Sequence, residues 1–174
     1  MMQKVEGIQR SFTARLFHHS IRGSEDYHGR LKALRLYSLQ RRRERYAIIR
    51  TWQILEGFVP NLSTNPITLR LSDRYVMRRE RICMKSEAGA EYENLFLNSF
   101  CVRGPKLFNT LPESIRKITG VTTDTFKNKL DKWLSLIPDM PIVDGLPVGR
   151  TETNSISEWC KIPDVKALLY VGGD

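Results

Sequence analysis

The chain has 174 residues, of which 41% are hydrophobic, so it has the length of one domain and enough apolar residues for one core. Its formal charge of +9 is uneven: residues 1–85 carry 18 Lys and Arg against 7 Asp and Glu, whereas residues 86–174 carry 10 against 12. A run of about 18 apolar residues and a signal-peptide core are both missing, which excludes a membrane-spanning helix and argues against secretion.

The cysteine pattern also favours an intracellular protein. Cys83, Cys101 and Cys160 are odd in number and widely spaced, so they indicate neither a disulfide framework nor a CxxC metal knuckle. We therefore expect reduced thiols in a nuclear or cytoplasmic protein. Because helix-like sequence follows Met1 directly, we also expect the chain to be a fragment of a longer protein.

Two helices are predicted in the first 36 residues. The first ends at Gly23, and its apolar residues recur every three or four positions, which places them on one helix face: Val5, Ile8, Phe12, Leu16 and His19. The second starts at Ser24, whose hydroxyl can cap the first amides. Its apolar stripe consists of Tyr27, Leu31 and Leu34.

Ser38 is the predicted N-cap of a third helix, which ends near Gly57. Ile48, Trp52 and Leu55 share one face of this helix, so we assign Trp52 to the core rather than to a base-stacking role. The first turns carry the densest cationic cluster of the chain, which comprises Arg41, Arg42, Arg43 and Arg45.

The helical period fades between residues 61 and 102, where we predict short strands. Residues 67–71 alternate between apolar and polar side chains, as a half-buried strand does, and residues 74–77 and 96–102 are weaker candidates. A second basic cluster lies between these candidates and comprises Arg78, Arg79 and Arg81.

The last part of the chain is predicted to contain a turn at Gly104–Pro105, a short helix, and a final helix that starts near Thr123 and stops at Pro138. The apolar face of the final helix consists of Phe126, Leu130, Trp133 and Ile137. We predict a mainly α fold with a small β element (α+β), in which residues 1–137 form a single domain and residues 138–174 form a tail that is ordered only in part.

The order and spacing of four segments are informative when they are taken together. The segments are residues 8–16, residues 27–39 with the arginine cluster, residues 99–112 and residues 126–131. The third contains Ser99-Phe100, then Arg103-Gly104, then Phe108-Asn109-Thr110-Leu111-Pro112. This order resembles the region downstream of the reverse transcriptase domain in proteins of non-LTR (LINE-type, jockey-like) retrotransposons.

The resemblance implies an accessory region of a protein that performs target-primed reverse transcription with an endonuclease and an RNA-directed DNA polymerase. Polymerase chemistry needs carboxylates that hold two Mg²⁺ ions, which the family supplies from an aromatic-x-Asp-Asp turn. This chain has no Asp-Asp pair. We therefore expect no catalytic residue, no metal and no cofactor in this chain alone, and no enzymatic activity.

The arginines are the candidate nucleic-acid-binding residues. Guanidinium groups bind phosphate bidentately, neutralising phosphates gives sequence-independent affinity, and Tyr46 could stack on a base. The candidates are Arg41, Arg42, Arg43, Arg45, Arg50, Arg78, Arg79 and Arg81. The alternatives are a solvated helix face in which Glu44 pairs locally, and basic protection of an exposed strand edge.

Other chemistry-bearing residues do not form a recognisable site. His18 and His19 are adjacent, but a metal site would have to recruit Cys83 or Cys101 without a known ligand spacing. Both cysteines lie in apolar stretches typical of buried thiols, outside any glycine-rich elbow. Phosphate-binding loops of the GxxxxGK[ST] or GxGxxG type are not found in the sequence.

Two functions from different classes stay open. The first is a non-catalytic fragment that holds RNA or DNA backbone through a basic face, without reading sequence. The second is a structural module whose first three helices pack on a polymerase thumb, and which would expose an apolar face along Val5, Ile8, Phe12 and Leu16. A decayed element without activity is a third reading. A membrane partner is not expected.

Overall fold

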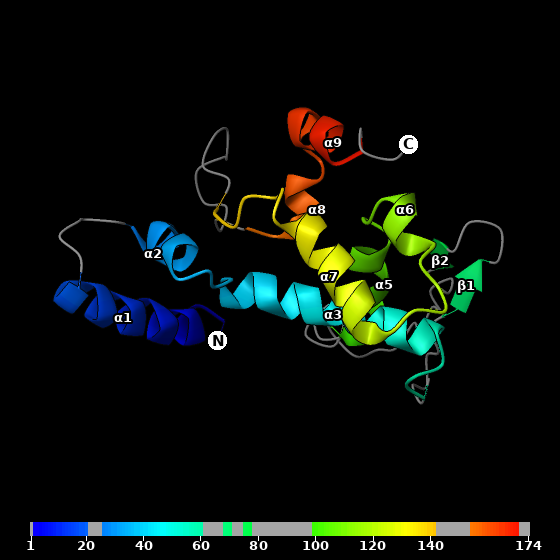
Figure 1. Cartoon of the computed structure of the whole chain (residues 1–174), viewed down its shortest axis with the longest axis horizontal. Coiled ribbons are helices and arrows are strands. Elements are labelled where there is room, and N and C mark those ends of the chain that lie inside the picture. Colours follow the sequence, from blue (N-terminus) through cyan, green and yellow to red (C-terminus); the bar gives the residue numbers. More distant parts are fainter. Residues whose placement is uncertain are drawn as a thin grey trace, which may run out of the picture.

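The computed structural model describes residues 2–20, 26–60, 68–70, 75–77, 99–141 and 154–170. The helices are α1 (Met2–Ser20), α2 (Tyr27–Ala33), α3 (Leu39–Leu55), α5 (Phe100–Phe108), α6 (Glu113–Arg116), α7 (Thr123–Leu134), α8 (Ile156–Trp159) and α9 (Pro163–Tyr170). Figure 1 shows α3 along the middle of the molecule, with α1 and α2 as a lobe beside its start and α5 and α7 beside its second half. None of the described helices is long and apolar enough to cross a membrane.

The fold is helical, so the predicted α+β class is wrong. The strands β1 (Thr68–Arg70) and β2 (Tyr75–Met77) are three residues each and pair antiparallel, with Leu69 opposite Val76. Within the described residues this ribbon pairs with no third strand, so it builds no sheet layer against the helices. Within the described residues the fold is therefore organised mainly by helix packing, with β2 in contact with α5.

The predicted strand over residues 96–102 and the predicted turn at Gly104–Pro105 are both wrong in the described part. Helix α5 begins at Phe100, after the extended residue Ser99, and it contains Gly104 and Pro105. A short apolar run cannot distinguish a strand from a helix by its period. Gly104 is needed for a close helix crossing, because a Cβ there would lie 2.6 Å from the Thr51 Oγ1 atom of α3.

Replacing Gly104 tests this crossing. We expect Gly104→Ala to lower the free energy of unfolding by about 1–3 kcal/mol, because the new methyl group must displace Thr51 or the ring of Phe100. Gly7→Ala is the matched control, since a Cβ at this position in α1 meets nothing within 4 Å. It should raise the free energy by about 0.5–1 kcal/mol. Urea denaturation measures both, and effects of the same sign would contradict the close crossing.

The core lies between α3, α5 and α7, and α8 and α9 close it. Trp52 is fully buried and stacks on Phe126 with 4.4 Å between ring centroids and 6° between ring planes. Its Nε1 donates a hydrogen bond of 2.9 Å to the Ile118 carbonyl. The core assignment of Ile48 and Trp52 is confirmed. The predicted apolar face of α7 is also buried and comprises Phe126, Leu130, Trp133 and Ile137.

Residues 154–170 belong to the segment that we expected to be ordered only in part. They form α8 and α9, and Ile156 and Leu169 belong to the same core cluster as Trp52. Because α8 has four residues and α9 has eight, neither shows a clear apolar period in the sequence. Ile137, at the end of the predicted domain, belongs to the same cluster.

Side-chain caps explain where three of the helices begin. Ser38 accepts a hydrogen bond from the Arg41 amide at 3.1 Å, as predicted. Asp26 caps α2 by accepting from the Gly29 amide at 2.8 Å, whereas the predicted cap at Ser24 lies outside the described residues. Thr122 caps α7. The Ser38 cap thus fixes the start of α3 next to Arg41.

Candidate nucleic-acid interface

Arg41 is a structural residue of the core and does not reach solvent. Its side chain is fully buried, and its guanidinium donates to the Pro138 carbonyl at 2.6 Å and to the Ile137 carbonyl at 3.4 Å. The Nε atom lies 3.8 Å from the Asp139 carboxylate. Burial lowers the pKa of Arg41, and the nearby carboxylates oppose this shift. Arg41 is thus unavailable to a phosphate.

Arg45 is held by an ion pair between two helices. Its Nε and Nη2 atoms donate to the two oxygens of Asp131 on α7, at 2.5 Å and 2.6 Å. The hydrogen bonds to Asp131 raise the pKa of Arg45. A phosphate would be bound by the same pair of N–H donors, which Asp131 already occupies. Arg45 therefore ties α3 to α7.

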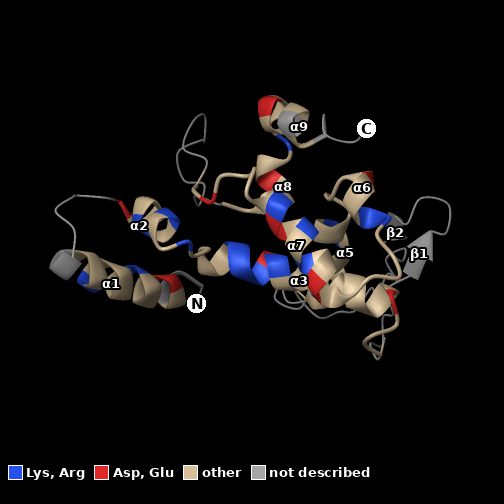
Figure 2. Ribbon diagram, in the orientation of Figure 1, with Lys and Arg blue, Asp and Glu red and all other residues tan. Residues whose placement is uncertain are grey.

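The exposed arginines of α3 lie on one face of the helix. Arg43 and Arg50 are exposed, Arg42 is half-buried, and Tyr46 has 59% of its surface exposed. Arg43, Tyr46 and Arg50 are spaced by three and four residues, which aligns them along one face, and we call them the α3 basic stripe. Among the described residues, none forms an ion pair with Arg43 or Arg50. Figure 2 shows the Lys and Arg positions along α3.

Arg78, Arg79 and Arg81 lie outside the described residues. In one alternative, Glu44 was expected to pair locally within the arginine cluster. Instead, its carboxylate accepts hydrogen bonds from Ser155 and Ile156 in the C-terminal segment. The structure therefore brings together the α3 basic stripe and separates it from Arg41 and Arg45.

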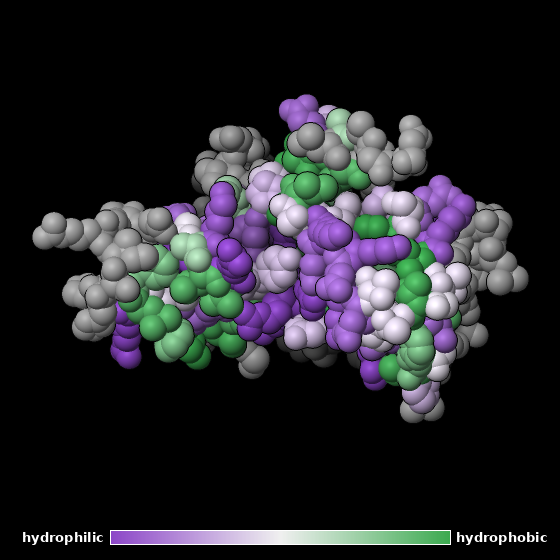
Figure 3. Space-filling model, viewed as in Figure 1, coloured by the Kyte–Doolittle hydropathy of each residue, from purple (hydrophilic) through white to green (hydrophobic). Residues whose placement is uncertain are grey.

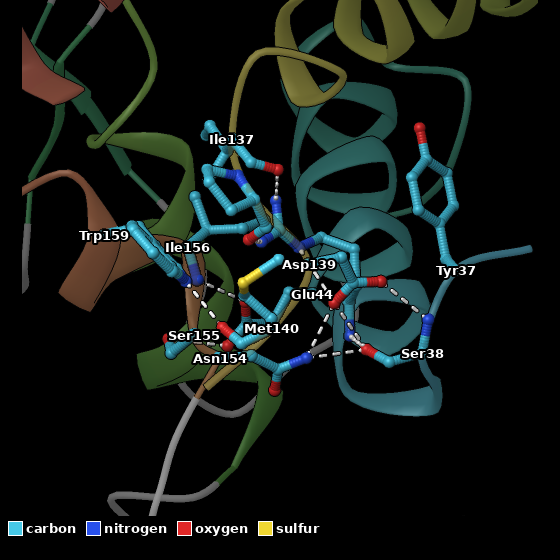
Figure 4. Close-up of polar contacts among 12 residues, drawn as sticks. Tyr37, Ser38, Glu44, Ile137, Asp139, Met140, Asn154, Ser155, Ile156 and Trp159 are labelled. Atoms are coloured by element: carbon cyan, nitrogen blue, oxygen red, sulfur yellow. Dashed lines mark hydrogen bonds and ion pairs between the residues drawn. The ribbon is translucent and has the colours of Figure 1, made fainter. Parts of the chain in front are cut away.

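Glu44 anchors the C-terminal segment in a buried polar network (Figure 4). Its side chain is 1% exposed, with Oε1 accepting from the Ser155 hydroxyl at 2.7 Å and Oε2 accepting from the Ile156 amide at 2.8 Å. Arg103, from the Arg-Gly pair of α5, lies 3.7 Å from Oε1. The charge of Glu44 is thus hydrogen-bonded and faces a cation, as a buried charge requires.

A second part of the same network surrounds Asp139 (Figure 4). The Asp139 carboxylate accepts from the Ser38 amide and from the Ser38 hydroxyl, each at 2.7 Å. Asn154 donates to both Asp139, at 2.6 Å, and Ser38, at 2.8 Å. These contacts fasten the start of α3 to two segments about 100 residues away. The network therefore serves to hold the fold together.

The histidines and cysteines do not form a metal site in the described part. The described residues contain no cluster of three His, Cys, Asp or Glu side chains suited to a metal ion. The His28 Nδ1 atom lies 2.8 Å from the Asp139 carbonyl oxygen. Burial raises the pKa of the Cys160 thiol to about 11, which disfavours the nucleophilic thiolate at neutral pH. Cys83 and the side chains of Cys101, His18 and His19 lie outside the described residues.

No protein-family model matches the chain, and neither a curated protein nor a solved structure shows significant similarity to it. The functional argument therefore rests on the residues themselves. The α3 basic stripe is the part of the predicted site that the described structure leaves accessible.

Proposed function

We propose that this chain is a non-catalytic helical module that holds the phosphate backbone of RNA or DNA through the α3 basic stripe. The supporting observation is that Arg43 and Arg50 are exposed and have no ion-pair partner among the described residues, with the exposed ring of Tyr46 between them. Seven residues of helix separate the two arginines by about 10 Å along the axis. Each guanidinium can therefore take a different phosphate, while Tyr46 offers a stacking surface to an unpaired base.

The charge distribution supports the same proposal. The first 85 residues hold 18 of the 28 Lys and Arg, so the stripe lies in the strongly basic half of the chain. The positive electrostatic potential of this half attracts nucleic acid whatever its sequence, and binding releases condensed counterions. Both effects weaken as salt is added.

We also propose that the chain derives from the C-terminal accessory region of a non-LTR retrotransposon protein. The residues that carry this resemblance have structural roles here: Gly104 permits the crossing of α3 and α5, and Phe108 and Leu111 are core residues. In this chain these matching residues therefore serve packing. An aromatic-x-Asp-Asp turn encoded upstream in the same reading frame is the expected genomic finding, and a different upstream domain would contradict it.

A double charge reversal tests the binding function. We expect Arg43→Glu/Arg50→Glu to weaken binding of fluorescent single-stranded RNA and duplex DNA by at least about tenfold at low salt, because two phosphate contacts become repulsive. The slope of log K against log salt concentration for duplex DNA should fall in magnitude by about 2. Fluorescence anisotropy over a salt series measures both.

Lys129→Glu/Lys132→Glu provides the matched control. Both lysines are exposed on α7, and their replacement changes the net charge by the same amount. A loss of affinity equal to that of the α3 variant would show that only net charge matters. Failure of the unaltered chain to bind either nucleic acid at low salt would reject the proposed function.

A further inference from the structure

A second surface, on α1, combines exposed apolar side chains. Val5, Ile8, Phe12 and Leu16 are 38%, 70%, 60% and 45% exposed, and their spacing of three and four residues places them side by side. We call these four residues the α1 apolar stripe. Figure 3 shows apolar residues gathered on the lobe of α1 and α2. Isolated exposed apolar residues are ordinary, but a contiguous stripe marks an interaction surface.

The neighbouring face of α1 is fastened to the rest of the molecule. Thr13 is fully buried and Phe17 is 7% exposed. Gln9 donates to the Tyr37 carbonyl at 3.1 Å, and Glu6 accepts from the Tyr27 hydroxyl at 2.5 Å. The apolar stripe is rotated by about a quarter turn from this face, since its residues precede the packed ones by one position. It is therefore presented in a fixed orientation and is not an unfolded end.

The charges beside the stripe are positive. Arg15 is exposed and lies three residues from Phe12 and seven from Ile8, so it borders the stripe on the same helix surface. Glu6 is the only acidic residue of α1, and its Oε1 atom already accepts from Tyr27 and from the Leu39 amide. In a parallel pairing of two copies along this stripe, Arg15 would face Arg15. In an antiparallel pairing it would face the start of the other α1, where Glu6 is held by the Tyr27 hydroxyl and the Leu39 amide.

We propose that the α1 apolar stripe is the docking site for an amphipathic helix of a different protein, whose apolar seam is flanked by Asp and Glu. The spacing is that of a helix–helix seam, which is narrower than the broad apolar face by which helices lie on membranes. Burial of Ile8 and Phe12 supplies the affinity, and Arg15 selects for acidic flanks. This surface is separate from the α3 basic stripe.

Two synthetic helical peptides with the same leucine seam test this proposal, one with glutamate flanks and one with lysine flanks. Binding to the full chain is measured by fluorescence anisotropy. We expect the glutamate peptide to bind at least about tenfold more tightly than the lysine peptide. Ile8→Ser/Phe12→Ser should abolish this binding. Leu136→Ser, which removes a 57% exposed leucine elsewhere, should leave it unchanged.

Three results would overturn the proposal. Equal binding of both peptides would show that the flanking charges do not determine the affinity. Sedimentation equilibrium that shows self-association, lost in Ile8→Ser/Phe12→Ser, would assign the stripe to a second copy of the chain. Binding to phosphatidylserine-containing vesicles that depends on Ile8 and Phe12, without peptide binding, would assign it to a lipid surface. RNA binding by Ile8→Ser/Phe12→Ser, which we expect to be unchanged, keeps this test independent of the α3 basic stripe.

Discussion

Trp52→Ala should lower the free energy of unfolding by about 3–5 kcal/mol, the range for truncating a fully buried large aromatic residue. The substitution removes the stack on Phe126 and leaves a cavity between α3 and α7. It also deprives the Ile118 carbonyl of the hydrogen bond from the indole. Urea denaturation followed by far-UV circular dichroism measures the loss.

Tyr46→Ala is the control for this prediction, because it truncates an aromatic residue on the exposed face of the same helix. Its effect on the free energy of unfolding should stay within about 0.5 kcal/mol. A large effect at Tyr46 together with a small one at Trp52 would mean that α3 is rotated relative to the structure described here, and the basic stripe would then be wrong as well.

Glu44→Ala should be comparably destabilising, by about 3–5 kcal/mol, because it removes one member of a buried charged network. The Ile156 amide loses its acceptor, the Ser155 hydroxyl loses its bond to Glu44, and Arg103 loses the carboxylate that faces it. The effect should be concentrated at the C-terminal segment. Hydrogen exchange is therefore informative, and we expect the Ile156 amide to lose protection more than the amides of α3.

Two variants sharpen the test of this network. Glu44→Gln keeps an acceptor oxygen but not the charge, so its cost should lie between zero and that of Glu44→Ala. Glu158→Ala removes an exposed acid that pairs with Lys161 and should change stability by less than about 1 kcal/mol. An unchanged exchange rate at Ile156 in Glu44→Ala would contradict the described contact.

The helical repeat of apolar residues predicted the long helices but not the short ones. It located α3 and α7 together with their buried faces, because each is long enough to repeat an apolar pattern several times. The short helices α8 and α9 offered no such repeat. The turn prediction at Gly104 failed because a glycine is used equally for a turn and for a close helix crossing, and only the position of Thr51 distinguishes them.

The burial of Arg41 shows why the candidate site was only partly predictable. Arg41 precedes Ile48 by seven residues, and Glu44 precedes it by four, so both continue the apolar face of α3. From the sequence, the charges of Arg41 and Glu44 indicated exposed side chains, since arginine and glutamate are rarely buried unless they are paired. Their partners Asp139, Ser155 and Ile156 lie about 100 residues away, which a local pattern cannot reveal.

The central claim is that one helix uses its arginines for two purposes, with Arg41 supporting the fold and Arg43 and Arg50 binding phosphate. Measuring both unfolding free energy and RNA affinity for Arg41→Met and for Arg43→Met/Arg50→Met tests it directly. We predict that Arg41→Met loses at least about 2 kcal/mol of stability while its folded state binds RNA normally. Arg43→Met/Arg50→Met should keep its stability and lose RNA affinity. The reverse pattern, or a loss of RNA affinity in Arg41→Met alone, would contradict the account.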